Sequence, residues 1–351
     1  MSEAKRIRVR VPGKAMLAGE YAVLAGAPAI VVAVAKYLEC VAEPAERLSI
    51  EGAGARWSEG EPETPELRFA RRAIRTVGQY LAGKGERLPA LRLSITDDLR
   101  APDGQKLGLG GSACTSVAVT AAGLAAAGRE LDQALIFKLA AIAHGAAQGK
   151  PGSAVDVAAC TFGGTIWTRK FDVEPYLGLL DGAPVVFAAA VDKAALPELE
   201  RLPDSRGLAL VFTGKSASTP VLVGEIERFA ERAPRQWAEF VARTANACDR
   251  LRRALLEGDE RAACAALDIA GRLLQTLGEQ AGVEIVTWEH REIAERAREA
   301  GGAAKVSGAG GGDCAVVLGG ESAGRNPAGS SDSSAFVLAP EFDRNGVHFE
   351  C

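Results

Sequence analysis

The chain has 351 residues, of which 48% are apolar and 25% charged; this is typical of a globular protein with a substantial core, and the length suggests about two domains. Its formal net charge is −4 and it has no block of Lys or Arg, so we expect neither nucleic acid nor a membrane as a partner. No apolar run is long enough to cross a membrane, and the first residues lack the apolar segment of a signal peptide.

The cysteines and histidines indicate a reducing environment and no metal centre built from histidine. The seven cysteines are scattered without CxxC spacing, which predicts free thiols in a cytoplasmic protein. The three histidines, His144, His290 and His348, lie far apart in the sequence. A metal site made from them is therefore not expected.

Hydrophobic periodicity in the first half predicts a mixture of strands and helices. Residues 5–11 alternate charged and apolar side chains, as in a half-buried strand, and residues 29–41 are rich in β-branched residues, as in a central strand. Further strands are expected at 48–50, near Trp57, at 91–96 and at 165–169, and helices at 66–81, 116–128 and 131–147.

Residues 12–28 form a small, apolar, glycine-punctuated run that holds one lysine and one glutamate, Lys14 and Glu20. An isolated lysine most often extends from a turn into solvent. The alternative is that Lys14 and Glu20 lie inside a cleft. The sequence leaves both interpretations open.

Residues 106–114, Lys-Leu-Gly-Leu-Gly-Gly-Ser-Ala-Cys, form a glycine loop that leads into an Ala-rich, helix-forming run. Glycines let a ligand approach the backbone closely, and the free N–H groups of a first helical turn favour an anion such as phosphate. Ser112 adds a hydroxyl that can reach a phosphate oxygen or a magnesium ion. A tight turn before a buried helix explains the same residues, so the loop alone is a weak signal.

Two familiar phosphate motifs are not fulfilled. The loop fits the dinucleotide pattern G-x-G-x-x-G/A, but the polar run 96–105 separates it from the preceding strand, whereas that motif leaves a strand directly. The triplet Gly-Lys-Ser at 214–216 resembles the end of a P-loop. The first glycine of that motif would fall at position 209, which is Ala209.

Asp156 is a single aspartate in a run of small apolar residues that follows a turn rich in Gly, Pro and Ser. Its simplest interpretation is a helix N-cap. Its neighbours Val157–Ala159 instead suggest burial, and a buried carboxylate needs a cationic partner. On that interpretation Asp156 is a candidate site residue.

The second half of the chain is predicted to be mostly helical. Helices are expected at 221–232, 235–256, 260–280 and 286–299, and short strands at 208–212, 314–318, 335–338 and 346–349. Four glycines within residues 308–312 form either an anion-binding nest or a packing turn. A domain boundary is expected near the start of residues 172–204, and the Ser/Gly-rich residues 321–334 predict a loop.

Three segments in this order, residues 12–28, 108–113 and 305–318, closely resemble the signature motifs of the GHMP small-molecule kinases. The resemblance spans both halves of the chain. It implies a two-domain α+β GHMP kinase fold, with a ribosomal S5 domain 2-like N-terminal domain (1–180) and a ferredoxin-like C-terminal domain (181–351). ATP and an acceptor would meet between the two domains.

Several details resemble the phosphomevalonate kinases within that family, namely residues 19–24 (GEYAVL), Lys106 before the glycine loop, residues 152–159, 213–219 (TGKSAST) and 308–314. The sequence departs from the pattern in several places, and the Ser-rich residues 321–334 stand where a C-terminal helix is usual. Gly111 stands where a serine is usual and Ala154 where a glycine is usual. The expected helix before Asp156 lacks the glutamate that binds magnesium in mevalonate kinases.

The resemblance implies ATP and Mg²⁺ as cofactors and a cytoplasmic monomer or homodimer that phosphorylates (R)-5-phosphomevalonate in the mevalonate route to isoprenoids. Lys14, Lys106 and Asp156 are the implied catalytic residues, because cations must bring two polyanions together and Asp156 would orient Lys14 or accept a proton. The implied nucleotide-binding residues are Gly108, Leu109, Gly110, Gly111, Ser112 and Ala113, with Ser112 also as the magnesium ligand. The implied substrate-binding residues are Glu20, Tyr21, Lys215, Ser216, Ser218, Thr219, Gly310 and Gly311.

Two other functions are compatible with the sequence. One is a sister GHMP kinase with an alcohol acceptor, mevalonate first, in which Asp156 would act as the base for the hydroxyl. The other is a non-catalytic sensor of nucleotide or ligand on the same scaffold. The missing magnesium-binding glutamate favours the sensor, whereas the presence of Lys14, Ser112 and Asp156 together favours a kinase.

Overall fold

The computed structural model describes residues 6–101, 103–149, 152–204, 207–216, 219–319, 336–338 and 341–350. Its strands are β1 (Ile7–Ala18), β2 (Ala29–Pro44), β3 (Ser49–Gly52), β4 (Ala55–Ser58), β5 (Leu91–Asp97), β6 (Thr165–Thr168), β7 (Leu199–Leu202), β8 (Ala209–Phe212), β9 (Ala303–Val306), β10 (Cys314–Leu318), β11 (Phe336–Leu338) and β12 (His348–Glu350). Its α-helices are α1 (Arg68–Gly83), α2 (Gly111–Ala126), α3 (Gln133–Gln148), α4 (Val155–Phe162), α5 (Glu174–Leu177), α6 (Pro184–Lys193), α7 (Thr219–Arg232), α8 (Pro234–Glu257), α9 (Glu260–Ala281) and α10 (Trp288–Glu299).

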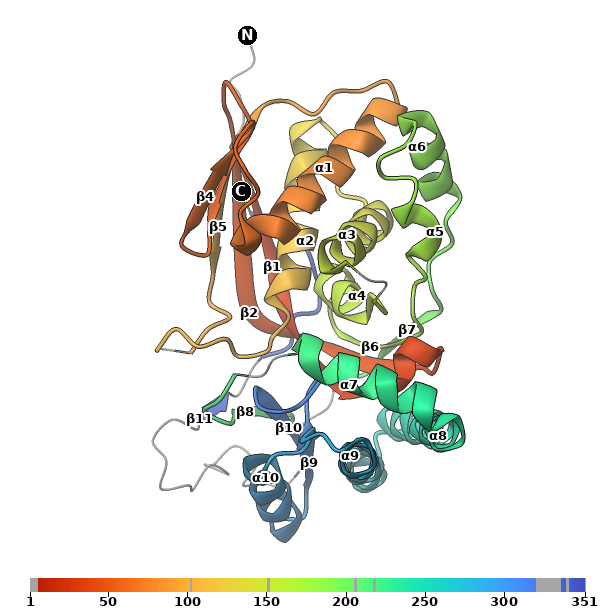
Figure 1. The fold of residues 1–351 in the computed structure, drawn as a ribbon. Helices are drawn as coiled ribbons and strands as arrows, with labels where there is room; N and C mark the ends of the chain where they lie inside the picture. Colours follow the sequence, from red (N-terminus) through yellow and green to blue (C-terminus); the bar gives the residue numbers. More distant parts are fainter. Residues whose placement is uncertain are drawn as a thin grey trace.

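The larger sheet is built around the long antiparallel pair β1 and β2, in the strand order β12-β1-β2-β5-β3-β4, with β6 on β2 and β7 on β6. Helices α1, α2, α3 and α4 lie together on one side of it (Figure 1). Helix α2 is buried over most of its surface and packs against α1, α3, α4, β1 and β2. Its run of alanines makes this possible, because small side chains let neighbouring elements approach from all directions.

The smaller sheet has the antiparallel order β11-β8-β10-β9 and lies at the other end of the molecule from α1 and α6 (Figure 1). Successive side chains along its strands point to opposite faces, and both faces are covered. Leu210 and Phe212 of β8 belong to the main apolar core, whereas Ala209 and Val211 pack in a second cluster with Ile293 of α10. The smaller sheet is therefore held between the rest of the molecule and α10.

The two sheets do not correspond to the N-terminal and C-terminal halves of the sequence. Strand β7 pairs with β6, and β12 pairs with β1, so both strands belong to the larger sheet although they lie within residues 181–351. The domain boundary between residues 180 and 181 stays a prediction. The pairing shows that the smaller sheet is built from chain that lies between β7 and β12.

Most expected elements occur where periodicity placed them. The four expected helices of the second half correspond to α7, α8, α9 and α10, and the hairpin near Trp57 is β3–β4. Strand β1 continues to Ala18, well beyond the expected residue 11, and is irregular between Pro12 and Gly13. The Ser/Gly-rich residues 321–334 lie outside the described part of the chain. None of the described helices is long and apolar enough to cross a membrane.

Candidate active site

Lys14 lies inside strand β1, and its side chain is only 7% exposed. The interpretation of Lys14 as a solvated lysine in a turn is therefore wrong. Its backbone N–H donates to the carbonyl oxygen of Leu109 over 2.9 Å, which attaches β1 directly to the glycine loop. Gly13 permits this approach, since a Cβ there would come within 3.1 Å of the same carbonyl oxygen.

The ammonium of Lys14 pairs with the carboxylate of Asp156, with Nζ and Oδ2 3.5 Å apart. Helix α4 begins at Val155 after Ala154, so Asp156 occupies the first turn and is not the N-cap. Burial alone would lower the pKa of Lys14, but the nearby Asp156 and Asp313 more than offset it, and the pKa lies above its usual value. Lys14 is thus a buried, charged lysine with Asp156 as its counter-ion. The side chain of Asp156 is 37% exposed, so the burial that its apolar neighbours suggested is only partial.

The glycine loop ends at Gly110, which is the residue before α2 and has a positive φ of 83°. No side chain caps the N-terminus of α2. The first N–H groups of this helix therefore remain available to an anion, as expected from the sequence. A Cβ on Gly110 would lie 2.8 Å from the side chain of Lys14, so glycine is required for the lysine to pass beneath the loop.

The second glycine-rich segment, residues 308–312, faces the first. A Cβ on Gly108 would lie 2.6 Å from Asp313, and one on Gly308 would lie 3.9 Å from Nζ of Lys14. The N–H of Gly311 donates to the carbonyl of Ile285 over 2.8 Å, so this amide already has an acceptor within the protein. The two segments thus meet around Lys14, the first lying between β5 and α2 and the second between β9 and β10 of the smaller sheet.

Ser112, the second residue of α2, lies against His144 of α3, with Oγ and Nε2 3.2 Å apart. His144 is buried, and its ring stacks on Phe69 of α1 with centroids 5.1 Å apart. Burial lowers the pKa of His144 to about 4, which the nearby Asp156 opposes. Sequence analysis missed His144, because a histidine in an apolar helix gives no local functional signal.

The remaining predicted cations lie on the outer side of these loops. Ser216 donates its hydroxyl to the carbonyl of Lys106 over 3.0 Å, which joins the segment after β8 to the glycine loop. Lys215 is 61% exposed and pairs with Glu289 of α10 at 2.5 Å. The sequence did not indicate a role for Glu289, because it is one of several charged residues in an amphipathic helix. Ser218 lies outside the described residues, and Thr219 begins α7.

Glu20 and Tyr21 were expected to bind substrate, and the structure places both in protein contacts. The carboxylate of Glu20 is buried against the ammonium of Lys305 at the end of β9. The hydroxyl of Tyr21 donates to the carbonyl of Ala309 over 2.5 Å. We therefore reassign both residues, as a proposal, to holding the second glycine-rich segment in place.

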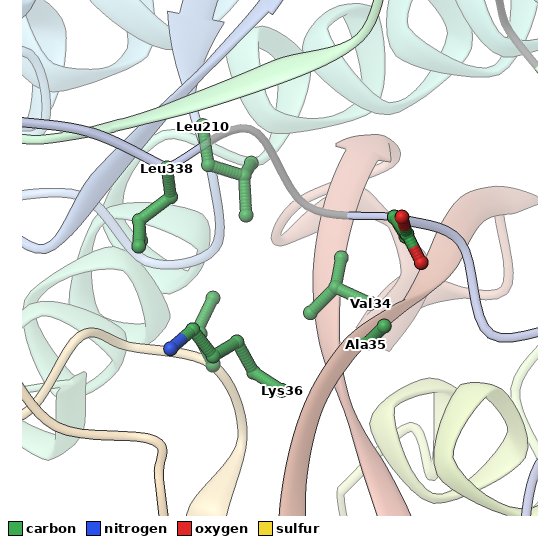
Figure 2. Close-up of a pocket in the computed structure, with 7 residues that line it drawn as sticks. Val34, Ala35, Lys36, Leu210 and Leu338 are labelled. Carbon is green, nitrogen blue, oxygen red and sulfur yellow. The ribbon is translucent and has the colours of Figure 1, made fainter.

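A pocket of ≈ 200 Å³ opens where β2, the glycine loop and the smaller sheet meet (Figure 2). It is lined by Val34, Ala35, Lys36, Leu109, Leu210, Leu338 and Glu341. One lysine is balanced here by one glutamate, so the pocket lacks the excess positive charge that a polyphosphate needs.

Comparisons with known proteins identify the family and the fold. The family model described as GHMP kinases N terminal domain matches residues 68–164, and that described as GHMP kinases C terminal matches residues 251–327. A phosphomevalonate kinase from Streptomyces sp. (strain CL190) is 35% identical, and the match covers 91% of each chain.

Solved structures share the whole fold. A protein from Listeria innocua matches with a TM-score of 0.88 and 29% identity, over 99% of both chains. The phosphomevalonate kinase of Streptococcus pneumoniae, in complex with phosphomevalonate and AMPPNP, matches with a TM-score of 0.83 and 23% identity over 95% of this chain and 99% of that one. These matches confirm the fold that the three glycine-containing motifs predicted.

Proposed function

Because the chain belongs to the GHMP kinase family, we propose that it transfers the γ-phosphoryl group of ATP to the phosphate of (R)-5-phosphomevalonate, forming (R)-5-diphosphomevalonate. The names and bound molecules of the similar kinases support the choice of donor and acceptor. The observation in this chain that carries the proposal is the buried ammonium of Lys14, held between Asp156 and two glycine-rich segments.

The glycine loop and the N-terminus of α2 are the proposed site for the triphosphate of ATP. Three features fit a polyphosphate: an uncapped helix N-terminus, glycines at Gly108 and Gly110 that leave no Cβ in the way, and the charge of Lys14 beneath them. Leu109, Gly111 and Ala113 contribute backbone to the same loop.

Ser112 is the proposed protein ligand of Mg²⁺. The described residues contain no group of three or more His, Cys, Asp or Glu side chains that could hold a metal ion. This fits a magnesium ion bound mainly by phosphate oxygens and water, with a hydroxyl from the protein. When bound, such an ion neutralises charge on the transferred phosphoryl group.

Lys106, Lys215 and Ser216 are the proposed contacts of the acceptor. Bringing an acceptor phosphate to a triphosphate places like charges together, and these residues supply cations and a hydroxyl beside the glycine loop. Gly310 and Ser218, with Thr219, remain predicted contacts of the same acceptor. Engagement of Lys215 requires it to leave or share its contact with Glu289.

Asp156 is proposed to orient Lys14. An acceptor phosphate has a second pKa of about 6 and is largely anionic near neutral pH, so it needs little help from a general base. An alcohol acceptor such as mevalonate would need Asp156 to take the hydroxyl proton. Turnover of the two acceptors therefore distinguishes a phosphomevalonate kinase from a mevalonate kinase better than substitution of Asp156 does.

The test is ADP release by the purified protein with Mg·ATP, offering phosphomevalonate and mevalonate in parallel, with a no-acceptor control. We expect strong turnover with phosphomevalonate and little with mevalonate. Preference for mevalonate would contradict the acceptor and leave the ATP site intact. ATP binding without turnover of either compound would favour the sensor.

A further inference from the structure

Ser112 and His144 form a contact that the proposed reaction does not by itself explain. Oγ of Ser112, in the first turn of α2, lies 3.2 Å from Nε2 of His144. One face of the imidazole packs on the ring of Phe69, at an interplanar angle of 27°. The guanidinium of Arg68 lies over Phe69 in turn, 4.8 Å from the ring centroid. Packing thus restricts the plane of the imidazole ring.

The chemistry of the serine hydroxyl indicates which of the two residues, Ser112 or His144, donates the hydrogen bond. A serine hydroxyl has one proton to donate and two lone pairs to offer. A magnesium ion and the N–H groups at the start of α2 can use lone pairs only, because neither accepts a proton. The proton of Ser112 therefore needs an acceptor on the protein side, and an imidazole nitrogen without its proton is one.

We propose that His144 is a positioning residue that accepts the hydroxyl proton of Ser112 at Nε2 and thereby directs the lone pairs of Oγ toward the magnesium ion of bound Mg·ATP. This inference rests on the proposed function, which assigns that ion to Ser112. It also requires a specific tautomer, with the ring proton on Nδ1. His144 acts through Ser112 and makes no direct bond to the metal.

The position of His144 explains how α3 serves the site without a carboxylate. The helix before Asp156 lacks the glutamate expected from mevalonate kinases, and His144 is the side chain that α3 brings to Ser112. A neutral imidazole adds no charge beside Lys14 and Asp156, whose mutual pairing is left intact.

The first test is the tautomer of His144 in the wild-type protein, read from ¹⁵N chemical shifts of the imidazole. The chain has only three histidines, so His144→Gln suffices to assign its signals. We expect a neutral ring protonated at Nδ1. A ring protonated at Nε2 would donate to Ser112, occupy one of its lone pairs and overturn the proposal. This test needs no active variant and no bound ligand.

The second test compares the binding of ATP with and without Mg²⁺ by calorimetry in three variants. His144→Leu removes the acceptor and should weaken Mg·ATP binding by about three- to tenfold, the usual effect of one hydrogen bond, with little change for ATP in EDTA. His144→Gln keeps an acceptor oxygen near the place of Nε2 and should restore most of the affinity. His348→Leu, on β12, is the matched control and should bind like wild type.

Equal losses with and without Mg²⁺, or no loss in His144→Leu, would contradict the proposal. These outcomes differ from failure of the proposed function. If wild type binds no Mg·ATP, or binds it but phosphorylates neither phosphomevalonate nor mevalonate, the kinase assignment fails whatever the variants do. Thermal unfolding of each variant shows whether a loss of binding comes from loss of the fold.

Discussion

Lys305 and Glu20 form a buried ion pair across 285 residues of sequence and join the two sheets of the molecule. Lys305 lies on β9 of the smaller sheet, and Glu20 follows β1 of the larger one. Neither side chain is more than 2% exposed. The ammonium also donates to the carbonyl oxygens of Met16 and Val306, so most of its bonding capacity is used.

Removing one partner of this pair should destabilise the protein strongly. Lys305→Met leaves the carboxylate of Glu20 buried and uncompensated, which typically costs about 3–5 kcal/mol of unfolding free energy. The double variant Lys305→Met/Glu20→Gln removes the charge as well and should recover at least half of the loss. Urea denaturation measures both.

The exposed pair Arg243–Glu239 supplies a control for that experiment. Arg243→Met should change the unfolding free energy by less than about 1 kcal/mol, because solvent screens exposed pairs. If Lys305→Met costs no more than this control, the pair does not hold the sheets together.

Lys14→Met should slow phosphoryl transfer strongly while preserving the fold. Methionine fills the buried volume of the lysine without its charge, and losing one preorganised charged donor typically lowers kcat by about 100-fold or more. Steady-state ADP release measures the effect. Lys84→Met, which removes an equally charged residue paired with Asp192, should keep wild-type activity. Retained activity in Lys14→Met would refute its catalytic role.

Gly110→Ala and Gly104→Ala separate a backbone effect from an effect on the site. Both glycines have a positive φ, 83° and 86°, so an alanine costs about 1–2 kcal/mol in either place. A Cβ at 110 meets the side chain of Lys14, whereas one at 104 has nothing within 4 Å. We expect similar stabilities, but a loss of roughly 100-fold in kcat/KM only for Gly110→Ala, because the catalytic lysine must move.

Acidification should destabilise the protein partly through His290. Burial lowers the pKa of His290 to about 4, below its ordinary value of about 6.5. Between these two values the unfolded chain binds a proton that the folded protein does not, so stability falls as pH falls through this window. The full effect is about 3 kcal/mol. Urea denaturation at several pH values should show a shallower dependence for His290→Gln, and an unchanged dependence would contradict this assignment.

The loops of the site were more predictable from sequence than their supports. Gly108 and Gly110 stand out as clustered glycines before an alanine-rich helix, and Lys14 as a lone lysine among small residues, although each had a purely structural explanation until the three motifs were taken together. His144 and Glu289 each sit in a helix whose periodicity accounts for them without any function. Their contacts with Ser112 and Lys215 depend on how helices pack.

Glu20 shows the opposite difficulty. Its isolation in an apolar run correctly suggested an enclosed position, and its partner could not be read from the sequence. Lys305 lies on a different sheet, and local patterns say nothing about which distant strand a buried charge will face. Lys14, the lysine of the same apolar run, pairs with Asp156.

The pairing of β12 with β1 makes the smaller sheet an insertion into the larger unit. Its chain leaves the larger sheet after β7 and returns to it at β12. A unit tethered at both ends can bend about a hinge line, but it cannot swivel freely on a single linker. Two connections therefore hold residues 308–312 opposite the glycine loop and Lys14, where a single linker would leave their relative orientation less restricted.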